Sequence, residues 1–336
     1  MDVIETVENP LRELVVRNQV PGLCIRATYK GRELYSRGFG FADLVKGELA
    51  DPGSTVYRSA SISKPITATA LLHLVSHGTI ALDADLREYV PEFPEKHGRI
   101  NIMQLASHTA GIRGYMGKEF ALNQPYSIAE SLQLFMNDPL VFSPGTGYLY
   151  NSFDFVLLSL AMERAAQMPF HKVVQKWVLN PLGMSQTYME IPHRPRPGQA
   201  AFYTRRRTEF RKAAPVDTRY KLAGGGYLST VGDICRLGQA YLEADAIPGK
   251  LGAEFLTAVK VNEDSTFYGL GWEVSRDAGG RRFFGHTGNA VGAYTNFKVF
   301  PDFNLVVSIL INASVPDVQP VLDAVTTALL ESVSAV

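Results

Sequence analysis

Cysteine is scarce in this sequence, and charge of either sign is not in excess. Cys24 and Cys235 are the two cysteines among 336 residues. Two thiols so far apart do not make the disulfide framework of a small secreted domain, so we expect both to fill small buried sites. The 33 basic residues balance 33 acidic ones. This balance gives no indication of nucleic acid or a membrane surface as a partner.

The chain also lacks the long apolar segments of exported and membrane proteins. Its start, MDVIETVENPLRELVV, has acidic residues where a secretory signal carries a basic region, and no uninterrupted apolar core follows. The most apolar segment, 305–311, has the length of a strand rather than of a membrane span. We therefore expect a cytoplasmic protein, or a periplasmic or secreted one if a signal has been removed.

Several common functional motifs are missing as well. Without G-x-S-x-G, the nucleophile elbow of the α/β-hydrolases is excluded. The triplet 224–226 is all glycine but lacks the Lys-Ser/Thr of a phosphate loop, so it predicts a glycine turn. His73 and His77 have metal-ligand spacing but no evident third ligand nearby. We expect these histidines to pack or to face solvent, and we expect no metal or cofactor.

Strand and helix patterns divide the chain into ends and a middle. Helical spacing predicts an amphipathic helix over 1–19, which Pro10 kinks or divides, and alternation then predicts a hairpin of two strands. The middle is mainly helical. An antiparallel sheet with the terminal helices on one face, and an inserted helical lobe, follows from this order. The expected strands are 23–29, 33–41, 268–274, 281–285, 292–299 and 304–311, with a last helix over 318–333.

The fold class is therefore α/β (α+β), with two lobes that share one core. We expect residues 1–59 and 221–336 to form the sheet lobe, residues 60–220 to form the helical lobe, and the active site to lie in the cleft between them. Residues 193–212, HRPRPGQAAFYTRRRTEFRK, are rich in arginine and proline. We interpret them as a solvated irregular loop. The alternative is a cationic rim that attracts an anionic substrate to the active site.

A Ser-x-x-Lys sequence marks the candidate nucleophile. Ser61 and Lys64 stand at the start of an apolar helical pattern, where positions i and i+3 lie on one face. The amine can accept the hydroxyl proton if its pKa is lowered, and the exposed N–H groups at the helix start favour developing negative charge. By itself the spacing is common, because an N-cap serine followed by a surface lysine gives the same pattern.

Two further segments in order sharpen this hypothesis. Tyr150 lies where a turn runs into an apolar helix, and its phenol would share the Ser61 proton and pass it to a leaving group. His286, Thr287 and Gly288 follow a predicted strand, and the N–H of Asn289 would join that of Ser61 in an oxyanion hole. His108, in ASHTAGI, fits a structural turn better than a catalytic base.

Taken together, SISK at 61–64, YNS at 150–152 and HTG at 286–288 resemble the three signature elements of the penicillin-recognising serine hydrolases. These include class C beta-lactamases, penicillin-binding proteins, D-amino-acid peptidases and family VIII esterases. Supporting phrases such as INIMQLASHTAGI, NPLGMSQTYM and AGGGYLSTVGDICRL spread the resemblance over most of the chain. The wording REYVPEFPEK and SHTAGIRGY is similar to the branch with a mitochondrial, filament-forming relative. The resemblance implies a beta-lactamase/transpeptidase-like fold with a five-stranded sheet.

The resemblance also implies roles for the motif residues. Ser61 becomes the nucleophile, Lys64 and Tyr150 the general base and acid, and His286 part of the pocket wall. Two positions depart from the family pattern: Ser152 stands where an asparagine contacts the substrate amide, and a histidine stands where beta-lactamases carry lysine. A mostly neutral imidazole is a poor anchor for a substrate carboxylate. Both changes favour esters or peptides over penicillins.

Three functions stay open at this point. The first is a serine hydrolase that forms an acyl-enzyme on Ser61 and cleaves carboxylic esters or amide bonds of a small-molecule or peptide substrate. The second keeps that machinery for beta-lactams or D-amino-acid peptides. The third is a scaffold or filament protein with little activity. Whether the chain forms a homo-oligomer is also left open.

Overall fold

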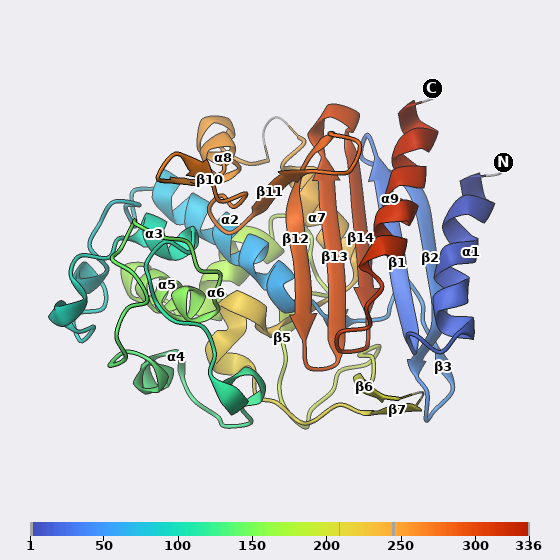
Figure 1. Cartoon of the computed structure of the whole chain (residues 1–336), viewed down its shortest axis with the longest axis horizontal. Coiled ribbons are helices and arrows are strands. Elements are labelled where there is room, and N and C mark those ends of the chain that lie inside the picture. Colours follow the sequence, from blue (N-terminus) through green and yellow to red (C-terminus); the bar gives the residue numbers. More distant parts are fainter. Residues whose placement is uncertain (1–2, 208, 244–245, 335–336) are drawn as a thin grey trace.

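Seven strands form one antiparallel sheet in the computed structural model, which describes residues 3–207, 209–243 and 246–334. Their order is β11-β12-β13-β14-β1-β2-β3 (Figure 1). The strands from both ends of the sequence meet where β1 pairs with β14, with Leu23 opposite Ile311. The bounds are β1 (Gly22–Tyr29), β2 (Arg32–Asp43), β3 (Glu48–Leu49), β11 (Glu273–Arg276), β12 (Arg282–Ala290), β13 (Ala293–Phe300) and β14 (Leu305–Ile311).

This sheet confirms the predicted fold class, but the expected number of five strands is wrong. The edge strand β3 has two residues and was not expected, while the strand expected over 268–274 is displaced, because β11 begins at Glu273 and has four residues. Strands this short carry too little alternation to fix their bounds. The HTG motif also lies inside β12, which runs on to Ala290 instead of ending at Gly285. Small and polar residues there pair with β13 through the backbone, so their side chains gave no strand signal.

The terminal helices lie on one face of the sheet, as predicted. Figure 1 shows α1 (Val3–Val16) and α9 (Gln319–Ser334) side by side across β1, β2 and β14. Val7, Leu11 and Leu14 of α1 are buried in a core shared with α9. The alternative that Pro10 divides the first helix is wrong, because this buried stripe stabilises one continuous helix despite the missing N–H.

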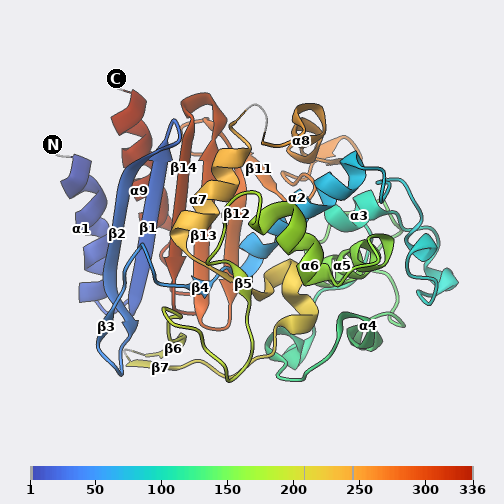
Figure 2. The ribbon, with the colours of Figure 1, turned by 180° about the vertical axis from the view of Figure 1, so that it is seen from behind.

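A further helix, α7 (Val231–Ala240), covers the opposite face of the sheet (Figure 2). The hydroxyl of Thr230, the N-cap residue of α7, accepts a hydrogen bond from Asp233 N. Gly238 lets the helix approach closely, since a Cβ there would lie 2.7 Å from Val306 Cγ1 and 2.9 Å from Val299 Cγ2. Helices therefore cover both faces of the sheet.

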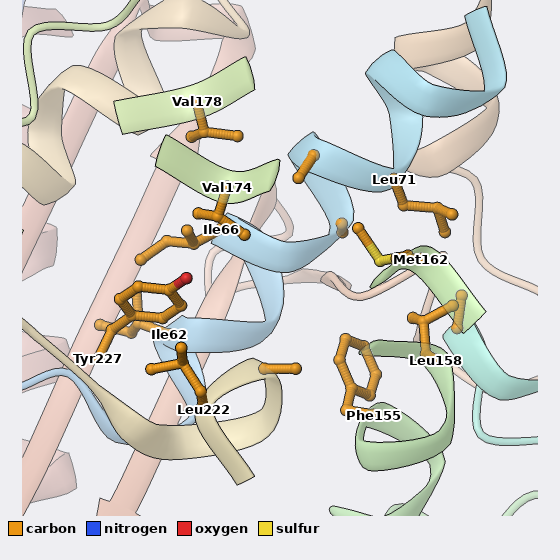
Figure 3. Close-up of a cluster of buried hydrophobic side chains, with 14 of the residues drawn as sticks. Ile62, Ile66, Leu71, Phe155, Leu158, Met162, Val174, Val178, Leu222 and Tyr227 are labelled. Atoms are coloured by element: carbon orange, nitrogen blue, oxygen red, sulfur yellow. The ribbon is translucent and has the colours of Figure 1, made fainter. Parts of the chain in front are cut away.

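The remaining helices gather beside the sheet. Helix α2 runs through this group with apolar residues on all sides, and Figure 3 shows Ile66 and Leu71 facing Leu158, Met162 and Val174 of its neighbours. Such packing fixes the helix that carries Lys64. The lobe boundaries at 59/60 and 220/221 stay a prediction. These helices are α2 (Ser63–Ser76), α3 (Ile102–Ala106), α4 (Ile128–Ser131), α5 (Phe153–Ala165), α6 (Phe170–Val174) and α8 (Gly249–Phe255).

Short strands complete the fold. Three of them, in the order β4-β8-β5, tie the segment before Ser61 to the segment after the glycine triplet. The arginine-rich residues 193–212 contain a hairpin, so the predicted irregular loop is only partly correct; its arginines are mostly exposed. Among the described residues no helix is both long and apolar enough to cross a membrane. The bounds are β4 (Tyr57–Arg58), β5 (Tyr188–Met189), β6 (Tyr203–Arg206), β7 (Glu209–Lys212), β8 (Tyr227–Ser229), β9 (Lys260–Val261) and β10 (Asp264–Ser265).

Candidate active site

Ser61 lies in a tight helical turn, Ala60–Ile62, immediately before α2. The turn begins with a left-handed backbone, φ 47° at Ala60, a conformation that costs energy for a residue with a Cβ and that concentrates at functional sites. Ser59 holds the turn in place, because its N–H and its hydroxyl both donate to Tyr227 O of β8, at 2.9 and 2.7 Å. Ser61 therefore lies in a turn that these hydrogen bonds hold in place, and not within helix α2.

Three predicted residues meet at this turn. Lys64 Nζ donates to Tyr150 Oη at 2.6 Å, and Tyr150 Oη donates to Ser61 Oγ at 2.8 Å. The direct contact from Lys64 Nζ to Ser61 Oγ is longer, 3.4 Å. Nζ also donates to Gly224 O at 3.0 Å. The two hydrogen bonds through the Tyr150 phenol are therefore shorter than the direct contact between Lys64 and Ser61 that the i, i+3 spacing predicted.

Burial sets the protonation states of this group. Lys64 is fully buried, and the loss of solvation lowers the pKa of its amine to about 7, although the Glu273 and Asp154 carboxylates partly oppose this shift. Burial raises the pKa of the Tyr150 phenol, which outweighs the lowering effect of its bond to Ser61. Near neutral pH the lysine can therefore exist as a free amine beside a protonated tyrosine.

The third motif brings β12 against the serine. Gly288 allows this approach, because a Cβ there would lie 2.3 Å from Thr295 Oγ1 and 2.9 Å from Ser61 N. Asn289 lines the same pocket as Ser61, while Thr287 donates its N–H to Glu273 at 3.1 Å. The oxyanion hole formed by the N–H groups of Ser61 and Asn289 stays a prediction that this placement allows.

His286 is buried, and neither ring nitrogen is left for a substrate. Its Nδ1 lies 2.6 Å from Thr287 O and must donate there, because a carbonyl only accepts. Its Nε2 then accepts from Tyr268 Oη at 3.0 Å. Burial, together with the Lys64 charge, lowers the pKa of His286 to about 3. The imidazole is therefore neutral at pH 7, and a place for His286 in the pocket wall stays a prediction.

Ser152 and Asn151 of the second motif, although neighbours in sequence, have different surroundings. Ser152 lines the pocket beside Ser61, which fits its predicted contact with substrate. Asn151 turns inward: its Oδ1 accepts from Asp154 N at 2.8 Å, and its Nδ2 donates to Asp154 Oδ2 at 2.7 Å. Asn151 thus secures the start of α5, and its amide is not available to a substrate.

His108 has a closer relationship to the site than its turn-like sequence indicates. The residue adopts φ 61°, as expected of a turn, and its ring centroid lies 4.6 Å from that of Tyr150. Its Nδ1 contacts Asp154 Oδ2 at 2.9 Å. Burial lowers the pKa of His108 and raises that of Asp154, so both favour their neutral forms. The predicted structural role fits, but sequence reasoning missed this support beneath the tyrosine.

Sequence reasoning also missed two cations at the pocket. Arg58 and Lys221 line it together with Ser61, Ser152 and Asn289. Arg58 is the last residue of β4 and Lys221 precedes the glycine triplet, positions that carry no recognised motif. None of the described residues of 193–212 lines this pocket, so the interpretation of that segment as a cationic rim finds no support here.

The two spaced histidines, in α2 and at its C-terminal end, pack as expected. His73 stacks on Trp177 with ring centroids 5.7 Å apart, and His77 lies 4.5 Å from the same ring. In the described ranges no cluster of three histidine, cysteine or acidic side chains is placed to hold a metal ion. Cys24 and Cys235 are free and buried, in agreement with their predicted role.

Comparison with known proteins now places the chain. A sequence model of the family described as Beta-lactamase matches residues 7–331. The chain belongs to the beta-lactamase family. Its similarity to "Serine beta-lactamase-like protein LACTB, mitochondrial" of Homo sapiens, 29% identity over 89% of this chain and 72% of the relative, confirms the predicted branch.

Two further proteins are similar to this chain, one in sequence and one in fold. Esterase EstB of Burkholderia gladioli is 33% identical over 195 residues, which is 53% of this chain and 48% of the esterase. The solved D-amino acid amidase of Ochrobactrum anthropi SV3 superposes with a TM-score of 0.88 over 98% of this chain and 99% of its own, at 19% identity. The beta-lactamase-family member described here therefore shares its fold with hydrolases named for different substrates.

Proposed function

We propose that this protein is a serine hydrolase that forms an acyl-enzyme on Ser61 and cleaves carboxylic esters. The observation that carries the proposal is the connected set of Lys64, Tyr150 and Ser61, with 2.6 and 2.8 Å between successive polar atoms. A lysine whose pKa is lowered to about 7 is a base matched to neutral pH. The chain is also similar in sequence to a protein named as an esterase, EstB of Burkholderia gladioli.

The distances support a proton path from Ser61 through Tyr150 to Lys64. When Lys64 is a free amine, both hydrogen bonds reverse, so that Ser61 Oγ donates to Tyr150 Oη and Tyr150 Oη donates to Lys64 Nζ. As Ser61 Oγ bonds to the substrate carbonyl carbon, its proton passes to Tyr150 while the tyrosine proton passes to the Lys64 amine, since the direct serine–lysine contact is longer. The tyrosine then protonates the leaving oxygen as the carbon–oxygen bond breaks, and Lys64 returns its proton to the phenol. Water repeats the sequence in reverse to release the acid.

The pocket supports esters over beta-lactams. His286 is neutral and has both ring nitrogens occupied, so it offers no charge for the carboxylate of a penicillin. Asn151 is turned inward, which leaves Ser152 in place of the amide contact. Amide bonds remain the second substrate class of the same machinery. An inert scaffold is disfavoured because all three polar side chains are in contact.

Intact-mass spectrometry after exposure to a fluorophosphonate or to a penicillin tests this function. We expect an adduct from the fluorophosphonate on the native chain and none on Ser61→Ala, together with release of nitrophenol from p-nitrophenyl valerate by the native chain alone. An adduct from the penicillin, turned over faster than by Ser61→Ala, would move the assignment to beta-lactams. No adduct from either reagent would favour the scaffold.

A further inference from the structure

Lys221 is a buried cation without a carboxylate partner. It is 8% exposed, and its Nζ donates one hydrogen bond, to Phe120 O at 2.8 Å. The rings of Tyr115, Phe120 and Tyr220 surround the ammonium group at 5.2 to 5.7 Å. Within the described part of the chain no ion pair involves Lys221. An ammonium group has three donors, so this environment leaves donors unassigned.

Among the described residues, two other buried cations are neutralised by carboxylates, while Lys64 has no ion pair either and can lose its charge because its pKa is lowered to about 7. Lys298, 9% exposed, contacts Asp323 at 2.6 Å, and Arg58 is held by both carboxylate oxygens of Glu190. The acids on the segments around Lys221 are already engaged. Glu119 binds Arg113, and Asp217 binds Arg219. Because a buried charge is costly unless it is paired, an unpaired one at a pocket indicates a partner that arrives from outside.

The position of Lys221 says which part of a substrate it would meet. It lines the pocket that contains Ser61, Ser152 and Asn289, and no acidic side chain is among the described residues of that wall. Tyr150 and Lys64 do not line this pocket either. In the proposed reaction the leaving group must lie beside Tyr150, which protonates it. The pocket with Lys221 therefore receives the other half of the substrate, the acyl group.

We propose that Lys221 is a binding site for a carboxylate on the acyl half of the substrate, so that the preferred esters are monoesters of dicarboxylic acids. This inference rests on the proposed serine hydrolase function and adds the substrate class. Arg58 is not the anchor, because the carboxylate of Glu190 neutralises its guanidinium group. Lys221, rather than the arginines of residues 193–212, would therefore attract an anionic substrate to the active site.

Pairs of esters with the same number of acyl carbons, one with a terminal carboxylate and one without, test whether the site recognises the substrate charge. We would compare kcat/KM for the p-nitrophenyl monoesters of glutaric and adipic acid with the valerate and hexanoate, subtracting the rate with Ser61→Ala. The ratio of anionic to neutral ester should exceed one in the native protein and fall at least about tenfold in Lys221→Met. The control Lys118→Met removes an exposed lysine of the nearby segment and should leave the ratio unchanged.

A second measurement needs no variant. Burial and the Arg58 charge lower the pKa of Lys221 to about 8, so the ratio should fall as the pH rises through that value. The titration of Lys64 affects both esters of a pair and cancels in the ratio, and kcat/KM reports the free enzyme. The substrate carboxylate stays ionised throughout this range.

The outcomes separate the two levels of the hypothesis. A ratio that neither Lys221→Met nor pH changes would overturn the carboxylate site, while Ser61-dependent turnover of the neutral esters would leave the hydrolase function intact. If 4-carboxyphenyl valerate, compared with 4-carbamoylphenyl valerate, depends on Lys221 instead, the acyl-side placement is wrong. If no ester is turned over faster than by Ser61→Ala, the proposed function fails and this inference fails with it.

Discussion

His108 Nδ1 lies 2.9 Å from Asp154 Oδ2, and both side chains are completely buried beneath the ring of Tyr150. This contact joins the turn that contains His108 to the first turn of α5, which contains Asp154. Asn151 donates to the same carboxylate oxygen at 2.7 Å. A buried set of hydrogen-bonded side chains stabilises the fold only while each partner is present. A buried polar atom that has lost its partner has given up its solvation without compensation.

Asp154→Ala should therefore destabilise the protein. The change leaves His108 and Asn151 without their acceptor in the interior, and we expect a loss of about 2–4 kcal/mol in the free energy of unfolding. Chemical denaturation measures it. Asp302→Ala, which removes an exposed partner of Arg282, is the matched control and should shift the midpoint far less. Equal shifts in the two variants would contradict the role of the buried contact.

Tyr150→Phe should reduce ester hydrolysis while keeping the packing of the ring. Without the phenol, Lys64 and Ser61 are left 3.4 Å apart and no group protonates the leaving oxygen. We expect kcat/KM to fall about 10²–10⁴-fold. Tyr148→Phe makes the same chemical change two residues away, where no hydrogen bond of the hydroxyl is recorded among the described residues. It should stay within a few-fold of the native rate; a similar loss in both would argue against a proton path through Tyr150.

The pH dependence should follow Lys64. Burial lowers its pKa to about 7; below that value the amine holds its proton and cannot accept another, and above it the base is free. For a neutral ester, kcat/KM should therefore rise with pH through about 7 and then level off. His286, with a pKa lowered to about 3, does not titrate in this range. A profile that is flat from about pH 5.5 to 8.5 would remove Lys64 as the base.

Gly288→Ala tests the close approach of β12 to the serine turn. The added Cβ would meet Thr295 Oγ1 at 2.3 Å and Ser61 N at 2.9 Å, so strand or turn must move. We expect a loss of at least about tenfold in kcat/KM and about 1–3 kcal/mol in stability. Gly249→Ala, where no atom lies within 4 Å of the new Cβ, should change neither. Native activity of Gly288→Ala would show that the turn tolerates displacement.

Much of the fold was predictable because local periodicity reports burial. The alternation in 23–41 and 292–311 predicted the central strands, and the apolar spacing near both termini predicted α1 and α9. The edge strand β3 was not predicted, and the bounds expected for the other edge strand, 268–274, overlap β11 only at 273–274, since two to four residues carry too little pattern. The strand course of 286–290 was hidden for a different reason. Backbone pairing with β13, rather than side-chain type, holds it.

The sequence by itself determined which chemical groups the site contains, because Ser61, Lys64 and Tyr150 are recognisable by residue type, spacing and order. Only the tertiary structure decided their properties. Burial among distant segments lowers the pKa of Lys64, occupies both nitrogens of His286 and leaves Lys221 unpaired beside Phe120. Solvation and pairing depend on residues a hundred positions away, and no local pattern records which of them will meet.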